Sequence, residues 1–200
     1  MQTQIVGFGL ALIGFLGTIL ICGLPMWQVT AFIGANIVTA QVYWEGLWMN
    51  CVLQSTGQLQ CKAYDSVLAL QQYQQASRGL VCSSIGIGVI AIGLSTVGLR
   101  CSNFFDYDRR KKSNIGMAGG AVFILAGITC IIPVCWYAYI IITRFYSTVA
   151  TDSMKGELGA SIYVGWVSGV LQVIGGGILL LVKNLYILQI MIMFDLSFFV

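Results

Sequence analysis

Two cysteines, Cys51 and Cys61, are the residues whose spacing points most directly to chemistry, the formation of a disulfide bond. The segment between them reads Val-Leu-Gln, then Ser-Thr-Gly, then Gln-Leu-Gln. A hairpin with its loop at 55–57 places Cys51 directly opposite Cys61, because residues opposed across antiparallel strands come within disulfide range. Gly57 supplies the positive φ that such a loop favours. A disulfide bond in turn implies an oxidising compartment.

The rest of the composition argues against enzymatic and metal-binding chemistry. The chain contains no His, which removes the commonest metal ligand and the usual general base. Four of the seven cysteines fall in apolar segments, where we expect small buried side chains: Cys22, Cys82, Cys130 and Cys135. We therefore expect no enzyme activity, no cofactor and no metal site. The net charge of +3 is too small and too scattered to indicate nucleic-acid binding.

Hydropathy places the chain in a membrane. It is 58% hydrophobic and only 8% charged, whereas soluble domains carry about 25% charged residues. Four apolar segments, at about 5–24, 79–99, 115–135 and 158–182, each approach the ~20 residues that span a bilayer. We expect one integral-membrane domain over 1–200. The first segment lacks a preceding basic region, which favours a signal anchor over a cleaved signal peptide.

Basic residues set the expected orientation. The densest basic stretch lies between the second and third apolar segments and holds Arg100, Arg109, Arg110, Lys111 and Lys112. The positive-inside rule places this loop, about 100–114, in the cytoplasm. Four spans then put both termini in the cytoplasm, with a tail at about 183–200. The loops at about 25–78 and 136–157 lie outside, which agrees with the compartment that the disulfide requires.

The first outer loop has the pattern of strands. Segments 29–33 and 37–44 are rich in β-branched and aromatic residues, and 34–36 reads as a turn between them. With the hairpin around 55–57 they predict a small antiparallel sheet. The fold class is therefore membrane α+β: a four-helix transmembrane bundle with an extracellular antiparallel β-sheet stapled by one disulfide.

Two helical features are expected beside the spans. Ser66 can cap a short outer helix over 67–77, whose apolar residues fall at helical spacing. The third helix is expected to continue past Arg144 and to turn at 147–153. The spans are rich in glycine, which lets helices approach closely in lipid, where apolar burial provides no drive between them.

The pattern Trp27, Gly46-Leu47-Trp48, Cys51 and Cys61 resembles the first extracellular loop of the claudin family. The segments Asn-Ile-Val-Thr-Ala-Gln at 36–41 and Gln-Ser-Thr-Gly-Gln at 54–58 are also similar to claudins. A further family pattern is carried by Glu157, Gly159, Tyr163, Gly165 and Trp166. The resemblance covers all but about the last fifteen residues. It implies a tight-junction protein that assembles with itself and with other claudins, within one membrane and across to the next cell.

The resemblance also implies a selectivity position. In claudins the residue after the second loop cysteine, here Lys62, helps to select ions, and charged rings lining a pore do so generally. A lysine there is similar to barrier-type or anion-leaning members. The alternative is a solvated surface charge, and Asp65 could offset it. Glu45 and Arg78 are expected on the same outer surface, with Arg78 in a structural role.

Further roles follow from the same resemblance. Val67 matches a position that inserts into a neighbouring copy beside an aromatic pair, here Phe145 and Tyr146, although it could equally pack on its own bundle. Glu157 belongs to the same assembly set. Cys101, at the cytoplasmic end of the second span, is a candidate for palmitoylation.

The chain departs from the family pattern in three places, the second outer loop, the cysteines and polar tail expected after the fourth span but missing here, and the C-terminal end, where the family has Tyr-Val. Residues 147–150 read Ser-Thr-Val-Ala where toxin-binding claudins carry an Asn-Pro-Leu type sequence, so enterotoxin binding is not expected. The tail from 184 is apolar, and we expect an interfacial segment in contact with membrane lipid. Its end, Phe198-Phe199-Val200, could add as a strand to a PDZ scaffold protein. A truncated or variant C-terminus would explain the tail equally well.

The expected function is that of a structural and adhesion protein of the tight junction in the plasma membrane. It controls paracellular ion and solute permeability, as a barrier or with weak anion selectivity. The alternative is an auxiliary subunit of a channel or receptor, which shares the Gly-Leu-Trp and paired-cysteine pattern. An intramembrane enzyme is disfavoured because the spans lack His and paired acids.

Overall fold

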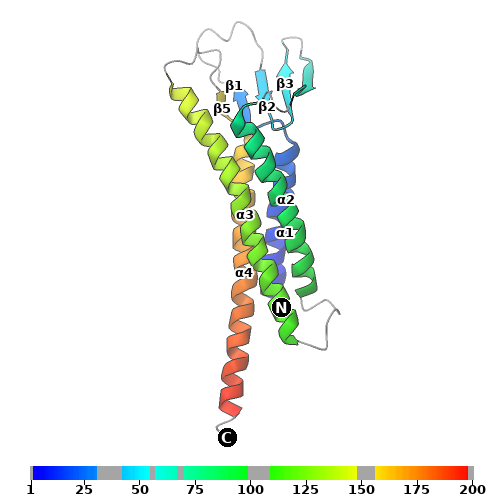
Figure 1. Ribbon diagram of the computed structural model, residues 1–200, viewed down its shortest axis with the longest axis vertical. Coiled ribbons are helices and arrows are strands. Elements are labelled where there is room, and N and C mark those ends of the chain that lie inside the picture. Colours follow the sequence, from blue (N-terminus) through cyan, green and yellow to red (C-terminus); the bar gives the residue numbers. More distant parts are fainter. Residues whose placement is uncertain are drawn as a thin grey trace.

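A bundle of four helices carries a small β-sheet at one end (Figure 1). The computed structural model describes residues 2–30, 42–54, 57–66, 70–98, 109–147 and 156–197, and it describes no side chains in 109–113 and 183–197. The helices are α1 (Gln2–Gly23), α2 (Gln72–Gly98), α3 (Arg109–Tyr146) and α4 (Ala160–Ser197). The strands are β1 (Gln28–Thr30), β2 (Val42–Glu45), β3 (Met49–Leu53), β4 (Leu59–Ala63) and β5 (Gly156–Leu158). The chain ends both lie away from the sheet (Figure 1).

Each helix contains a segment long and apolar enough to cross a membrane. In the described chain these segments are Gln2–Gly23, Gln72–Gly98, Asn114–Tyr146 and Ala160–Val182. The first helix ends just before Pro25, which cannot continue it. The third runs past Arg144 as predicted, and it includes Pro133 without ending there. The four-span prediction is confirmed.

The second helix begins later than predicted. We expected a short outer helix over 67–77 that enters the membrane and leads into a span at about 79–99. The structure has one continuous helix, Gln72–Gly98, and residues 67–69 lie outside the described part. No proline interrupts the backbone hydrogen bonds of this segment, and Gly79 alone does not end a helix.

The fourth helix also differs at both ends. It begins at Ala160 rather than near 158, because residues 156–158 form strand β5. It continues to Ser197, beyond the predicted end of the span at about 182, so residues 183–197 extend the helix in line (Figure 1), and their interfacial position stays a prediction. Past Gly177 the sequence has no Gly or Pro, and Leu, Ile, Met and Gln sustain the helix.

The bundle packs as a ring in which α1 neighbours α4 and α2, and α3 neighbours α4 and α2. Buried polar groups join the helices. The Gln172 amide donates to the Thr18 hydroxyl oxygen at 2.8 Å, and the Ser84 hydroxyl donates to the Ala126 carbonyl at 2.8 Å. Such hydrogen bonds hold helices together where lipid provides no hydrophobic drive. Above them an apolar cluster that includes Trp27, Leu47 and Tyr137 joins the bundle to the sheet.

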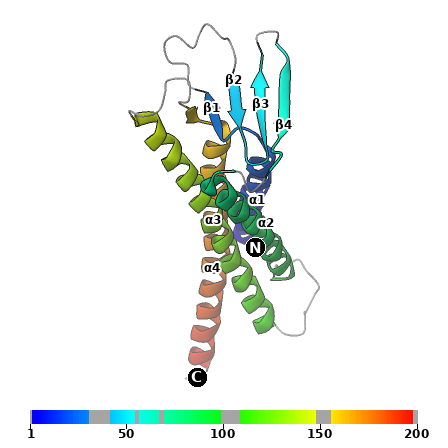
Figure 2. The same ribbon diagram turned by 45° about the horizontal axis from the view of Figure 1, so that its top comes forward.

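The sheet has the strand order β4-β3-β2-β1-β5, with every neighbouring pair antiparallel. Figure 2 shows β1 to β4 side by side above the bundle. The predicted strands 29–33 and 37–44 correspond to β1 and β2, and their inner parts fall within residues 31–41, which the structure does not describe. Strand β5 was not predicted. It comes from the second loop and extends the sheet at the β1 edge.

Close helix contact gives a direct test of the bundle. A methyl group on Gly14 would lie 2.5 Å from the Ser168 carbonyl oxygen on α4, whereas one on Gly9 would meet nothing within 4 Å. We therefore expect Gly14→Ala to force α1 from α4 and to lower the free energy of unfolding by about 1–3 kcal/mol. Gly9→Ala, the matched control, should leave it unchanged or slightly raised. Denaturant titration in micelles measures both, and equal stability of the two variants would contradict this packing.

Candidate functional site

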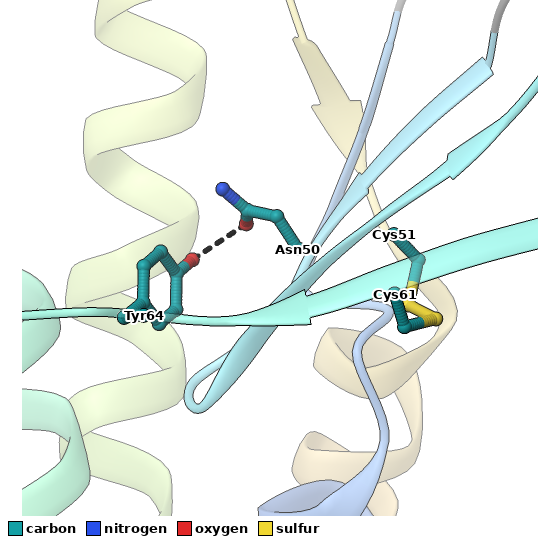
Figure 3. Close-up of a disulfide and its surroundings, with 4 residues drawn as sticks. All are labelled: Asn50, Cys51, Cys61 and Tyr64. Carbon is teal, nitrogen blue, oxygen red and sulfur yellow. Dashed lines mark hydrogen bonds between the residues drawn. A yellow bond between two sulfur atoms is a disulfide. The ribbon is translucent and has the colours of Figure 1, made fainter.

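The hairpin of β3 and β4 has the predicted register. Cys51 faces Cys61, Val52 faces Gln60 and Leu53 faces Leu59. The two cysteines form a disulfide bond across a Cα–Cα distance of 4.0 Å (Figure 3). Gly57 has a φ of 78°, and its N–H donates to the Gln54 carbonyl at 2.9 Å. The disulfide prediction is confirmed, and the bond fixes which residues of both strands share a face.

One face of the sheet is polar. Asn50 is paired with Lys62 on one side and with Glu45 on the other, so these three side chains project from the same face. A shallow groove of about 570 Å³ runs over this face. It is lined by Tyr43, Asn50, Val52, Gln54, Gln60, Cys61 and Lys62, the set that we call the polar face.

Lys62 is paired with an acid. Its Nζ lies 2.6 Å from Asp65 Oδ2, and both side chains are more than three-quarters exposed, at 78% and 79%. An exposed pair of this kind adds little stability, because water and salt screen it. The pair instead changes the electrostatic field in the groove, because the Asp65 carboxylate largely offsets the charge of Lys62 there.

Glu45 belongs to the same face by register, but its carboxylate is not free. It is half-buried and accepts a hydrogen bond from the Gln74 amide on α2. Burial raises the pKa of the Glu45 carboxyl, and the Arg144 charge and the Gln74 hydrogen bond partly oppose this. Glu45 therefore contacts the helices, in contrast to its predicted place with Lys62 on the exposed surface.

Tyr64 connects the Glu45–Gln74 hydrogen bond to the sheet. Its hydroxyl donates to Asn50 Oδ1 at 2.6 Å (Figure 3). Burial, and then the nearby Glu45 charge, raises the pKa of Tyr64 to about 12, so its hydroxyl stays protonated and keeps donating. On α3, Arg144 donates to the Tyr73 hydroxyl at 3.1 Å and to the Gln71 side chain, which ties α3 to the start of α2.

The Gly-Leu-Trp motif attaches the sheet to the helix bundle. Leu47 is 1% exposed, and its carbonyl accepts a hydrogen bond from Arg78 Nε. The Arg78 guanidinium carbon lies 5.0 Å from the Trp48 ring centroid and 5.1 Å from that of Tyr64. Gly46 is required because a Cβ there would overlap the backbone of Pro25. We call Trp27, Gly46, Leu47, Trp48 and Arg78 the junction.

Arg78 is thus a buried cation rather than an exposed charge of the outer surface. It is only 6% exposed, and its Nη2 has no hydrogen-bond partner among the described residues. A carbonyl oxygen and two aromatic faces take the place of water around it. Trp27 completes the junction, with its indole N–H donating to the Ile21 carbonyl at 2.8 Å and its ring 5.1 Å from that of Tyr137.

A second hollow lies where the second loop meets the helices. It has a volume of about 270 Å³ and is lined by Ile141, Ile142, Phe145, Tyr146, Gly156, Glu157, Leu158 and Tyr163. The structure thus brings the aromatic pair Phe145 and Tyr146 and Glu157 to one hollow, and the role of these residues in assembly stays a prediction. The rings of Phe145 and Tyr146 are 5.4 Å apart, and Tyr146 is 79% exposed. The hollow is therefore open to a side chain from outside.

Some predicted residues lie outside the described part of the chain. These are Val67, Cys101, Phe198, Phe199 and Val200, so their roles remain predictions. Conversely, sequence reasoning missed Asn50, Gln74 and Arg144, which hold the sheet to the helices. The only sequence signal for Gln74 and Arg144 was that each is polar at the edge of an apolar span. Among the described residues no group of three or more His, Cys, Asp or Glu could hold a metal ion.

Comparisons with known proteins match this architecture. Residues 1–179 match the sequence profile of the PMP-22/EMP/MP20/Claudin family. Claudin-4 of Homo sapiens is 51% identical over 179 residues, which is 90% of this chain and 85% of that protein. Claudin-like protein ZF-A89 of Danio rerio is 52% identical over 176 residues, covering 88% and 84%. Claudin-3 of Canis lupus familiaris is 49% identical over 179 residues, covering 90% and 82%.

The junction predicts a specific cost for the change Arg78→Lys. Lysine keeps the charge but loses the Nε–H bond to Leu47 and the flat group between two rings. We expect the free energy of unfolding to fall by about 1–3 kcal/mol. Denaturant titration of the full chain in micelles measures it, with Lys62→Arg on the exposed sheet as the control. An Arg78→Lys variant as stable as that control would refute the role of the guanidinium.

Glu45 predicts a pH dependence whose sign follows from its raised pKa. A carboxyl whose pKa is higher in the folded state than in the unfolded state stabilises most when protonated, and this contribution is lost as pH rises through the folded pKa. Gln at this position is permanently neutral. The melting temperature of Glu45→Gln should therefore equal that of the parent below about pH 4.5, the ordinary pKa of a glutamate side chain.

Above that pH the variant should become progressively more stable than the parent. Thermal unfolding of both proteins across a pH series measures the difference, in which titration of the other carboxyls cancels. A melting-temperature difference that stays constant with pH, or that reverses sign, would show that burial does not raise the pKa of Glu45.

Proposed function

The chain belongs to the PMP-22/EMP/MP20/Claudin family, and we propose that it is a tight-junction protein that closes the path between neighbouring cells. The sheet faces the extracellular space and both termini face the cytoplasm. The chain works as a structural protein, assembling with itself and with other claudins, and it makes or breaks no covalent bond of a substrate.

The orientation is supported by two independent features. The Cys51–Cys61 disulfide lies in the sheet, which requires an oxidising side. The basic residues that begin α3, Arg109 to Lys112, lie at the opposite end of the bundle (Figure 1), which the positive-inside rule assigns to the cytoplasm.

The Lys62–Asp65 pair is the observation that favours a barrier over an anion path. A free lysine on the polar face would attract chloride, as charged rings do in pores. Here a carboxylate 2.6 Å away offsets that charge, and Glu45, whose carboxylate accepts a hydrogen bond from Gln74, does not line the groove. Among the described residues that line the groove, Lys62 is the only charged side chain, and Asp65 compensates it. We propose a barrier with little ion preference.

The hollow at the second loop supports side-by-side assembly. The apolar residues of its lining, among them Ile141 and Leu158, and the exposed Tyr146 ring would be covered by an aliphatic side chain of a neighbouring copy. Val67, which matches the inserting position of the family, is the residue that we propose for this contact. Assembly would thereby repeat along the membrane plane.

Electrical measurement tests the proposal. The chain is expressed in an epithelial line that lacks its own claudins, and transepithelial resistance and salt-dilution potentials are recorded. We expect resistance to rise, with a chloride-to-sodium permeability ratio near that of free solution. Lys62→Gln should shift the ratio toward sodium and Asp65→Asn toward chloride, each by about two- to fivefold, since one unpaired charge acts at ~1 kcal/mol in water.

Two further variants sharpen the test. The double variant Lys62→Gln/Asp65→Asn should return the ratio to the parent value, and Lys62→Arg should keep it. Ratios that ignore both single changes would contradict the role of the pair. An unchanged resistance despite surface delivery would favour the alternative, an auxiliary subunit of another membrane protein.

A further inference from the structure

An apolar groove runs along the half of the bundle nearer the sheet, between α1 and α4. It has a volume of about 460 Å³ and is lined by residues of these two helices, among them Leu16, Val164 and Val167. All of its lining residues fall within the spans Gln2–Gly23 and Ala160–Val182. What fills the groove is therefore lipid or another membrane-embedded group rather than water.

The groove exists because its floor has almost no side chains. Gly17 of α1 lies against Ser168 of α4, and a Cβ on Gly17 would overlap the Ser168 side chain. The Ser168 hydroxyl is turned toward its own helix, where it donates to the Val164 carbonyl at 2.6 Å. Leu16 and Val167, each more than half exposed, form walls on either side. The floor is thus closely packed, and its one hydroxyl is already bonded within α4.

The groove has one polar end. Tyr163 lies in the first turn of α4, directly after strand β5 and at the outer limit of the span. Its side chain is about half exposed, and its ring meets that of Trp166 edge-on, with 5.7 Å between the centroids. The described residues give its hydroxyl no hydrogen-bond partner. A tyrosine at this level of a bilayer holds its hydroxyl near the lipid headgroups.

These features fit a sterol better than a phospholipid. Tyr163 and Leu171, at the two ends of the groove, are about 12 Å apart along α4 at 1.5 Å per residue, a length that suits the fused rings of a sterol. A sterol carries a single hydroxyl at one end of a rigid apolar body. A phospholipid carries a charged headgroup, and none of the described lining residues is charged. Its flexible chains would also lose more conformational entropy on binding.

We propose that this groove binds a sterol, whose rings lie over Gly17 between Leu16 and Val167 and whose hydroxyl forms a hydrogen bond with that of Tyr163. Tyr163 also lines the hollow at the second loop. A bound sterol therefore holds a ring that belongs to the surface proposed for assembly. The groove thereby links the sterol content of the membrane to that surface.

Photolabelling of the full-length chain in vesicles tests the proposal. The purified protein is reconstituted in phosphatidylcholine with a small fraction of a cholesterol analogue that carries a diazirine on its rings. After irradiation, mass spectrometry of the peptides should find the label within residues 13–20 and 163–171. Unlabelled cholesterol should displace the analogue. Its 3-hydroxyl epimer, whose hydroxyl points away from Tyr163, should displace the analogue less well.

Two variants with matched controls separate the groove from the rest of the lipid-facing surface. Val167→Trp fills the groove and should lower labelling several-fold, whereas Val89→Trp, at a comparably exposed valine of α2 outside the groove, should not. Tyr163→Phe removes one hydrogen bond, so the cholesterol fraction that halves labelling should rise about two- to tenfold. Its preference for cholesterol over the epimer should vanish. Tyr139→Phe, at an exposed tyrosine of α3, should keep the parent values.

Three results would overturn the proposal. Label that spreads evenly over the four spans, or that unlabelled cholesterol leaves in place, would show contact with the surrounding lipid and no site. Equal displacement by cholesterol and its epimer in the parent would remove the hydrogen bond to Tyr163. Photo-leucine at position 16 that links two copies of the chain, and no sterol, would assign the groove to a second copy.

Discussion

The buried guanidinium of Arg78 is the constraint on which the position of the sheet depends. A cation that is 6% exposed must find replacements for water, and this one uses the Leu47 carbonyl and the rings of Trp48 and Tyr64. Those three residues belong to the outer segment, whereas Arg78 belongs to a span. A shift of the sheet away from this position would therefore remove the partners of the buried charge.

The position of the sheet on the bundle determines which side chains are exposed on its polar face. Once the junction fixes β2 and β3, the disulfide fixes β4 against β3, and alternation along the strands assigns Asn50, Gln60 and Lys62 to the polar face. Glu45 at the edge of this face is drawn into contact with Gln74, which ties the sheet to α2 a second time. The acid that could have made the groove attractive to cations is thus used to hold the sheet.

The hairpin and the spans could be predicted from the sequence, because each is determined by residues that lie close together along the chain. Loop position and the period of two determine the register of Cys51 and Cys61, and length and hydropathy determine a span. Strand β5 has only three residues and no alternation, so it is recognisable only beside β1. The burial of Glu45 depends on how α2 is rotated and placed against its neighbours, which a single sequence does not specify. The continuation of α4 to Ser197 was missed because Lys183 and Asn184 interrupt the apolar run, and two polar residues do not end a helix that contains no Gly or Pro there.

Freeze-fracture electron microscopy of fibroblasts that express the chain and lack junctional strands of their own tests the central claim most directly. If the seated sheet and the hollow beside Tyr146 mediate assembly, continuous intramembrane strands should appear where two expressing cells touch. Protein that reaches the surface with its Cys51–Cys61 bond formed, yet leaves those contacts free of strands, would contradict the account.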